Sequence, residues 1–564
     1  MSSAQSLLDQ LDKLKDQFDP QASRSVANLL TRLAQQQLNE PDMLIRYHEL
    51  LLFLVAYPQS TAILRAAEIQ LRNFSLRVKE LARDYELSSI GYPEVSGIAG
   101  TQVTDTFSYY IVAWLQRNYP TQTSLYWDWF EDENRLAQTW PRFLPLLAED
   151  ALVEANVPYR DWLRAARGKS DELPWLLERF ARLALTEEER AELYDSQKLY
   201  VRWAFPYRAS RTGLRLPRRG NKLFWHRGPL IQRRDLSFRD DLMAPPPKFE
   251  KLNIREGQSV LDLSRAASTV RYRELYGFTH GDPKRVIRAD LGRGVVLFVI
   301  GLPAQRRLPL RAYHAAMIFK NRIPIGYFEG LSIAERMESG FNLYYTFRDG
   351  ETAWLYAQTL NVMHHLLGVS TFSLDPYQIG FENEEGIASG AFWFYRKLGF
   401  RPVRKSLLAL TLKEEAKIKS RAGYRTATAT LRKLAAGSMI FELEEQRTGD
   451  WDSFQVRSIG LATQRLLAFR CDGNANQLQQ IAIKHCQRTL NVNISRWAEK
   501  QLKAFVDFST LLLQIPDLND WTLAEKDQLL AIIKAKVAPD EGKYLKLSQK
   551  HKRFRSALIA LGSR

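Results

Sequence analysis

Cysteine is nearly absent from this chain of 564 residues, which contains only Cys471 and Cys486. No metal-ligand pattern surrounds either residue, so neither a disulfide framework nor a metal site is expected. The amino terminus, MSSAQSLLDQLDKLKD, has neither the basic start nor the apolar run of a secretory signal. The longest strongly apolar run, Leu50–Tyr57, is far shorter than the roughly 18 residues that span a bilayer. These absences predict a cytoplasmic protein without a membrane span.

Acidic residues are missing between Val201 and Arg234, although ten Lys or Arg residues lie there. The whole chain carries a net charge of +17, so this stretch supplies more than half of the excess. Aromatic residues are interleaved with the cations: Trp203, Phe205, Tyr207, Phe224 and Trp225. Such a mixture can neutralise phosphates and stack on bases, which makes Arg208–Arg234 a candidate nucleic-acid contact. The alternative is that these cations pair with acidic helices such as Leu185–Asp195.

The hydrophobic spacing changes along the chain and divides it into four regions. Up to about residue 200, apolar residues recur every three or four positions, which is typical of helices. Residues 201–250 form a basic linker that contains three consecutive prolines. Residues 251–405 alternate between strand-like and helical segments, and residues 406–564 return to helical spacing. We therefore expect an α/β domain with a mixed sheet and flanking helices, inserted between two mainly α-helical regions.

Within the α/β region the sequence predicts a definite order of elements. The strand-like segments VIRADL and VVLFVIGL are followed by a hairpin with its turn at Lys320–Arg322. A further strand is predicted at Phe341–Phe347, and helical spacing runs over Thr352–Leu367 until Gly368. Another strand is predicted at Ser370–Leu374. The order is therefore hairpin, strand, helix, strand.

The segment Gly390–Pro402, GAFWFYRKLGFRP, follows this order. It is similar to the last helix and turn of the GNAT superfamily of N-acyltransferases, written as Ala, three residues, Tyr, three residues, Gly-Phe. Ala391, Tyr395, Gly399 and Phe400 occupy those positions. The resemblance extends from about Arg285 to Val403, about a fifth of the chain. It implies transfer of an acyl group from acetyl-CoA, or another acyl-CoA, to the amine of a small molecule or protein.

The resemblance also implies roles for individual residues. The Tyr395 hydroxyl is expected to protonate the departing thiolate, and Ala391 to let the acyl carrier come close. The turn Arg348–Ala353 is expected to hold the coenzyme pyrophosphate at the start of the following helix, where backbone N–H groups are free. The coenzyme-binding candidates are Arg348, Gly350, Thr352, Ala353 and Ala391.

An amine acceptor must lose a proton, usually to a carboxylate, a histidine or a water held by one. Glu329, Asp375 and Glu382 are the candidate bases, since each is expected near the cleft. Each can instead be an exposed loop carboxylate without a catalytic role.

Two positions depart from the family pattern. Glu351 occupies the central glycine position of the phosphate turn, where a carboxylate is expected to repel phosphate, while Gly350 lies one place early. Ala388 occupies the position of a frequent asparagine, and Asn383 lies five residues upstream. These departures leave open an alternative function, a non-catalytic GNAT-like scaffold that binds nucleic acid or protein.

Overall fold

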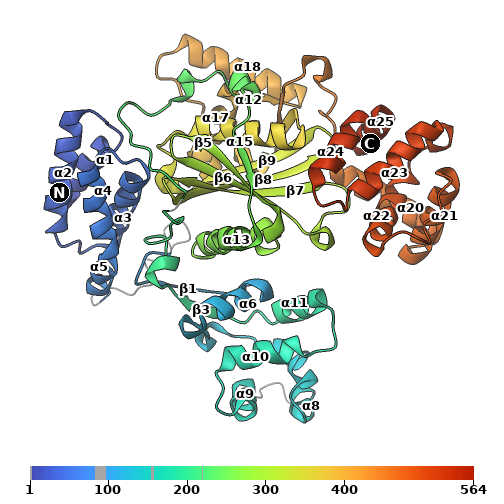
Figure 1. Cartoon of the computed structure of the whole chain (residues 1–564), viewed down its shortest axis with the longest axis horizontal. Coiled ribbons are helices and arrows are strands. Elements are labelled where there is room, and N and C mark those ends of the chain that lie inside the picture. The colour runs from blue at the N-terminus through green and yellow to red at the C-terminus, as the bar shows by residue number, and fades with distance from the viewer. Residues whose placement is uncertain (1–2, 83–96, 154–157, 219, 564) are drawn as a thin grey trace.

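The computed structural model describes residues 3–82, 97–153, 158–218 and 220–563, and every statement below concerns these residues (Figure 1). Among them, nine strands form one mixed sheet in the order β11-β12-β10-β9-β8-β7-β6-β5-β4. The strands are β4 (Phe249–Lys251), β5 (Val286–Gly292), β6 (Val295–Gly301), β7 (Ala312–Lys320), β8 (Ile323–Ile333), β9 (Arg336–Leu343), β10 (Thr371–Leu374), β11 (Arg401–Pro402) and β12 (Met439–Glu442). The predicted α/β class with a mixed sheet is therefore confirmed.

The hairpin of β7 and β8 forms where the sequence predicts it. Lys320 pairs with Ile323, and the two turn residues, Asn321 and Arg322, have φ values of 45° and 75°. Two positive φ values are typical of a type I′ turn, whose twist matches that of the flanking strands.

The parallel strands β9 and β10 are joined by helix α15 (Thr352–Leu367). Their pairing ends at Ser373 opposite Glu338, and β10 itself ends at Leu374, while β9 continues beyond it to Leu343. The Ser339 hydroxyl lies 2.9 Å from that of Tyr356 in α15, and Phe341 packs on the same ring. Because side chains alternate along a strand, Arg336 and Glu338 point to the opposite face of the sheet.

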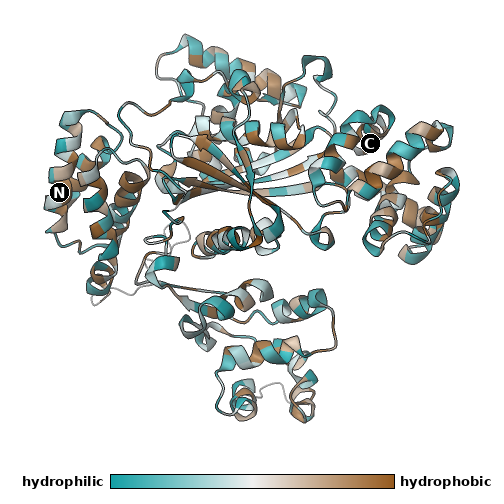
Figure 2. Cartoon of the chain, viewed as in Figure 1, coloured by the Kyte–Doolittle hydropathy of each residue, from teal (hydrophilic) through white to brown (hydrophobic). Residues whose placement is uncertain are grey.

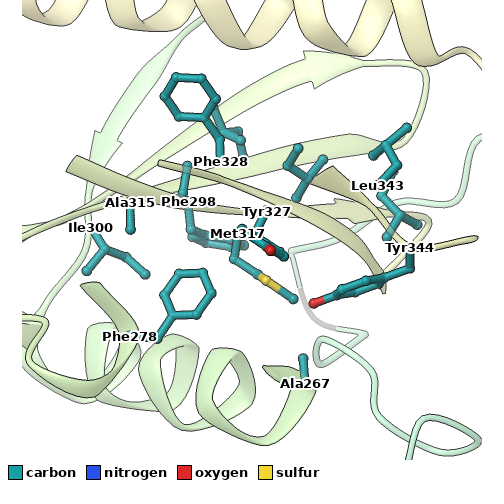
Figure 3. Packing of buried hydrophobic residues seen from close by; sticks show 14 of the residues in the cluster. Ala267, Phe278, Phe298, Ile300, Ala315, Met317, Tyr327, Phe328, Leu343 and Tyr344 are labelled. Carbon is teal, nitrogen blue, oxygen red and sulfur yellow. The ribbon is translucent and has the colours of Figure 1, made fainter. Parts of the chain in front are cut away.

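Helices cover both faces of the sheet. Helix α13 (Ile254–Thr269) lies on one face, and α15, α12 (Phe238–Met243) and α17 (Ala391–Lys397) lie on the other (Figure 1). Figure 3 shows the apolar core between α13 and the sheet, to which Phe278, Ala315 and Met317 contribute. Figure 2 shows that hydrophobic residues concentrate in the central strands, while the surrounding helices have mixed character.

The amino-terminal region begins with helices α1 (Ser3–Leu14), α2 (Pro20–Ala34), α3 (Pro41–Ala56), α4 (Thr61–Arg72) and α5 (Phe74–Leu81). Further helices are α6 (Tyr109–Asn118), α7 (Asn134–Ala137), α8 (Leu147–Ala151), α9 (Tyr159–Arg167), α10 (Glu172–Ala181) and α11 (Glu187–Ser196). Strands β1 (Gln102–Asp105), β3 (Val201–Ala204) and β2 (Thr123–Leu125) form a small antiparallel sheet among them. The spacing up to residue 200 did not indicate β1 and β2, which are too short for their alternation to be recognised.

The basic stretch is not a free linker. Trp203 is fully buried in β3, Leu214 and Leu216 are buried, and the Leu216 N–H donates to the Arg322 carbonyl. Its apolar residues anchor it between the amino-terminal helices and the large sheet.

The carboxy-terminal region contains α18 (Lys405–Ser420), α19 (Thr428–Leu434), α20 (Val456–Cys471), α21 (Ala475–Thr489), α22 (Glu499–Leu512), α23 (Leu523–Ala535), α24 (Glu541–Lys550) and α25 (Lys552–Gly562). The helical spacing from residue 406 onward did not indicate β12, which joins the large sheet. Arg307 donates to the Lys536 carbonyl at 2.6 Å, and Lys536 Nζ donates to the Arg311 carbonyl at 2.8 Å, so these helices dock on the sheet through buried bonds. Two further short helices in the α/β region are α14 (Tyr276–Thr279) and α16 (Glu384–Ala388).

Within the described ranges, no helix has the length and apolar character needed to cross a membrane.

His48 in α3 makes folding sensitive to acid. Its ring is buried and lies 2.8 Å from the Thr212 hydroxyl, and burial lowers its pKa from 6.5 to about 4. The unfolded chain binds this proton below about pH 6.5, so stability is expected to fall by about 3 kcal/mol as the pH drops from 6.5 to 4. Denaturant unfolding of the wild type and His48→Gln at pH 7 and pH 5 tests this, because the substitution should reduce the pH dependence. An equal pH dependence in both proteins would contradict it.

Candidate functional site

A cavity of about 600 Å³ lies at the start of α15, and we call it the α15 cavity. Every residue that the sequence predicts to bind coenzyme lines this cavity, and so does Tyr395: Arg348, Gly350, Thr352, Ala353, Ala391 and Tyr395. Phe341 and Leu343 complete the wall where β9 extends beyond the end of β10. The turn, the end of β9 and helix α17 thus meet around one space.

The start of α15 has unsatisfied donors. Glu351 occupies its N-cap position, and no side chain among the described residues caps the helix there. The first-turn N–H groups of a helix lack partners within the helix and attract anions. Arg348 stands beside them, donating from Nε to the Leu343 carbonyl at 3.1 Å and pairing with Glu385 at 2.5 Å. Arg233 also lines the cavity, together with the carboxylates Asp16, Asp349 and Glu385.

Glu351 does not face this cavity. Its side chain is buried on the inner side of the turn, where it pairs with Arg293 and with Lys320 Nζ at 3.1 Å. The Ile231 N–H donates to the same carboxylate at 3.2 Å. Burial alone would raise the pKa of Glu351, but Lys320 and Arg293 hold it below its ordinary value. The carboxylate is therefore not part of the cavity lining, and two cations balance its charge.

Gly350 is required by close packing against the amino-terminal helices. A Cβ atom at this position would lie 2.2 Å from the Tyr57 hydroxyl oxygen and 2.7 Å from its Cζ. Tyr57 follows α3 and is fully buried. The side chain that packs against the turn therefore belongs to a residue almost 300 positions earlier in the chain.

Gly350→Ala is expected to lower the free energy of unfolding by about 1–3 kcal/mol, because overpacking displaces the turn or Tyr57. Tyr57→Phe removes the nearest clashing atom, so the double variant should lose less than the two single losses added together. Urea unfolding of the four proteins measures this coupling. Gly228→Ala, where a Cβ meets nothing within 4 Å, is the control and should change little.

Tyr395 lines the α15 cavity. Its ring packs against Tyr356, Phe394 and Phe400, with ring centroids 5.1–5.8 Å away. The hydroxyl donates to and accepts from none of the described residues, and burial raises its pKa. Gly399, with φ of 103°, ends the helix so that Phe400 turns into the core. Tyr395 is therefore a protonated phenol with an open hydrogen-bonding capacity beside the cavity.

The three candidate bases are not brought together. Asp375 and Glu382 line a second cavity of about 650 Å³, which we call the β10 cavity. Glu329 lines neither cavity; its carboxylate accepts a hydrogen bond from the Tyr313 hydroxyl, and burial raises its pKa. Asp375 accepts from the Tyr377 N–H at 2.9 Å, and Glu382 is exposed.

Sequence reasoning missed two residues of the β10 cavity, Arg336 and Glu338. The strand was predicted to begin at Phe341, whereas β9 begins at Arg336. The alternation in RMESGFNL was the available signal. Asn383 lines the α15 cavity, whereas Ala388 is exposed. The upstream asparagine therefore adds a polar side chain to the cavity lining.

Part of the basic stretch borders a third cavity of about 680 Å³, which we call the β4 cavity. Five cations line it, against Glu250 and Asp290: Arg218, Lys222, Lys248, Arg288 and Arg322. The predicted pairing with the acidic helix is not found among the described residues, since Glu187 and Glu188 pair with Arg306 and Arg211 pairs with Glu49. Arg219 lies outside the described residues.

Within the described part of the chain, no group of three His, Cys, Asp or Glu residues is arranged to hold a metal ion. Comparison with known proteins gives no match: no family model, no curated protein and no solved structure resembles this chain closely enough to count.

Proposed function

We propose that this protein is an acyl-CoA-dependent N-acyltransferase of the GNAT type, moving an acyl group from acetyl-CoA or another acyl-CoA to an amine. The observation that carries this proposal is the α15 cavity, where an uncapped helix start and a buried, unpartnered phenol share one space. The order hairpin, long strand, helix, strand and motif helix, with β9 extending beyond the end of β10, supports it further. The inward orientation of Glu351 removes the main objection to phosphate binding.

The residues suggest how the reaction would run. The pyrophosphate would accept hydrogen bonds from the first-turn N–H groups of α15 and from Arg348, with the helix dipole favouring the negative charge. The amine nitrogen attacks the thioester carbonyl carbon, the C–S bond breaks, and the nitrogen loses one proton. Tyr395 gives a proton to the departing thiolate and regains one from solvent. An amide and a free thiol result.

Calorimetric titration with acetyl-CoA tests the proposal, and the absence of heat at millimolar ligand would refute it. Ala391→Phe should abolish or strongly weaken binding by filling the cavity. Ala388→Phe is the matched control, because this nearby alanine is exposed and lines neither the α15 cavity nor the β10 cavity. Equal weakening by both variants would show that the ligand binds elsewhere.

A second candidate function, binding of nucleic acid, is favoured by the cations of the β4 cavity. Neutralising several phosphates makes affinity fall steeply with salt. The triple variant Arg218→Ala, Lys222→Ala and Lys248→Ala should weaken binding to a single-stranded oligonucleotide and reduce the salt dependence. A charge-matched triple variant at the exposed Arg142, Arg425 and Arg496 is the control. Binding that is absent or independent of salt would exclude this function. A cytoplasmic location stays a prediction.

A further inference from the structure

The β10 cavity lies across the sheet from α15. Arg336 and Glu338 of β9 point away from α15, and Ser373 of β10, which pairs with Glu338, lines the same cavity. The loop that follows β10 separates the β10 cavity from the α15 cavity. Tyr377 and Glu382 of this loop line the β10 cavity, while the residues next to them, Gln378 and Asn383, line the α15 cavity. A molecule in the β10 cavity would therefore approach the end of the α15 cavity where β9 extends beyond β10.

Arg336 is a buried cation that lacks a hydrogen-bonding partner among the described residues, although its guanidinium lies 5.4 Å from the centroid of the Phe454 ring. The residue is 8% exposed, and its guanidinium makes no hydrogen bond with any described residue. Its nearest carboxylate is Glu338 at 3.9 Å, beyond hydrogen-bond distance. Arg311 is also 3.9 Å from Glu338 and has no other carboxylate partner in the described ranges. Two guanidinium groups thus share one distant carboxylate.

Arg401, in the nearby strand β11, is by contrast fully paired with carboxylates. Arg401 donates to Glu442 at 2.8 Å and to Asp452 at 2.8 and 2.9 Å. A guanidinium carries five N–H donors in a planar fork that suits carboxylate or phosphate. A buried charge without partners is costly, so the five donors of Arg336 are suited to an anion that arrives from outside.

The remaining lining of the cavity suits the rest of an amine acceptor. Asp375 and Glu382 supply carboxylates on the loop that faces the α15 cavity. Tyr377 and Phe381, which are 56% and 42% exposed, place aromatic side chains on the same loop. The cavity therefore has a cationic wall in β9, a carboxylate loop and an apolar rim.

We infer that the β10 cavity is the acceptor site, and that the acceptor is an amine that also carries a carboxylate or phosphate group. Arg336, assisted by Arg311, binds the anionic group. Asp375 or Glu382 holds the ammonium and takes its proton before the neutral nitrogen attacks the thioester carbon, while the thiolate is protonated as described above. This inference rests on the proposed acyl transfer and adds the class of its substrate.

The experiment compares amines that differ only in the anionic group. Amino acids from glycine to 6-aminohexanoate are set against alkylamines of matched length, and phosphoethanolamine against ethanolamine. Release of coenzyme A from acetyl-CoA and calorimetric heats are measured with the full-length protein. At least one anionic amine should have a KM about tenfold lower than its neutral counterpart, and the carboxylate and phosphate series identify the preferred anion. Neutral amines that serve equally well would overturn the inference.

Arg336 variants connect the preference to the cavity. Arg336→Gln should abolish it and Arg336→Lys should weaken it, because lysine keeps the charge but loses the fork. Arg311 shares Glu338 with Arg336 but is more exposed, so Arg311→Gln replaces the Arg336 variants in this test if those do not fold. Arg425→Gln, which removes an exposed arginine outside the three cavities, should keep the preference. A preference that survives in the variants of both Arg336 and Arg311 would refute this site.

The heats separate the two proposals. If acetyl-CoA binds but no anionic amine gives heat at 10 mM, the acceptor site is wrong while the acyltransferase proposal stands. If anionic amines bind through Arg336 but acetyl-CoA does not, acyl transfer is wrong and the cavity is a site for anionic amines alone.

Discussion

Replacing Tyr395 by phenylalanine is expected to lower kcat for coenzyme A release by roughly 100- to 10,000-fold, the range that general acid catalysis contributes. The ring packs against Tyr356, Phe394 and Phe400 without a hydrogen bond to any of the described residues, so loss of the hydroxyl should leave the fold intact. The affinity for acetyl-CoA should change little, because the phenol acts on the thiolate that forms during reaction. Thiol release with the best amine, or with water as acceptor, measures the rate.

Tyr345→Phe is the matched control, since Tyr345 is 67% exposed and does not line the α15 cavity. It should retain the wild-type rate. A Tyr395→Phe enzyme with unchanged kcat would assign proton donation to another group, such as water in the cavity. A fall in affinity with unchanged kcat would instead make Tyr395 a binding residue.

Glu351→Gln is expected to lower the free energy of unfolding by about 3–5 kcal/mol, because it leaves the fully buried Lys320 beside Arg293 without their carboxylate. Lys320 already has its pKa lowered to about 8, chiefly by burial. The double variant Glu351→Gln and Lys320→Met should recover much of the loss, since it removes the fully buried cation that Glu351→Gln leaves unpaired, and Arg293 is partly exposed. Urea unfolding at pH 7 measures all three proteins.

The pH dependence gives an independent check. The folded pKa of Glu351 lies below its ordinary value of 4.5, so the carboxylate contributes stability above about pH 4.5 and loses it as the pH falls through the folded value. The difference between wild type and Glu351→Gln should therefore shrink in acid. Glu385→Gln, which breaks a half-exposed pair with Arg348, should cost less than about 1 kcal/mol. A similar loss of unfolding free energy in both variants would contradict the stabilising role of the buried Glu351 ion pair.

Local patterns predicted much of the central fold. The turn at Asn321 and Arg322 and the helix Thr352–Leu367 with its end at Gly368 depend on neighbouring residues, and both form as predicted. The short strands β1, β2 and β12 depend on pairing with distant partners, so three or four residues of alternation were too few to indicate them. The basic stretch looked like a linker because its charges obscured the buried Trp203 and Leu216.

The candidate site divides in the same way. The motif around Tyr395 and the turn at Arg348 are local, and they line one cavity as the resemblance implies. The orientation of Glu351 depends on Lys320 at the end of β7 and on Arg293 in the turn between β5 and β6, so its sequence position alone did not indicate which way it points. Glu329 lies in β8 and accepts a hydrogen bond from Tyr313 of the neighbouring β7, whereas Asp375 and Glu382 follow β10. The arrangement of the strands, which is not local in sequence, therefore keeps Glu329 apart from the other two candidate bases.

The contact of Tyr57 with Gly350 makes the amino-terminal helices part of the central site. A shortened protein that begins at β4 would lack the side chain on which the turn rests, even though it would keep every residue of the family resemblance. Any ligand that orders the start of α15 must also favour the docked position of α3, and undocking of α3 must weaken that ligand to the same degree. Ligand binding at the start of α15 and docking of α3 are therefore thermodynamically linked, although the two segments lie far apart in the sequence.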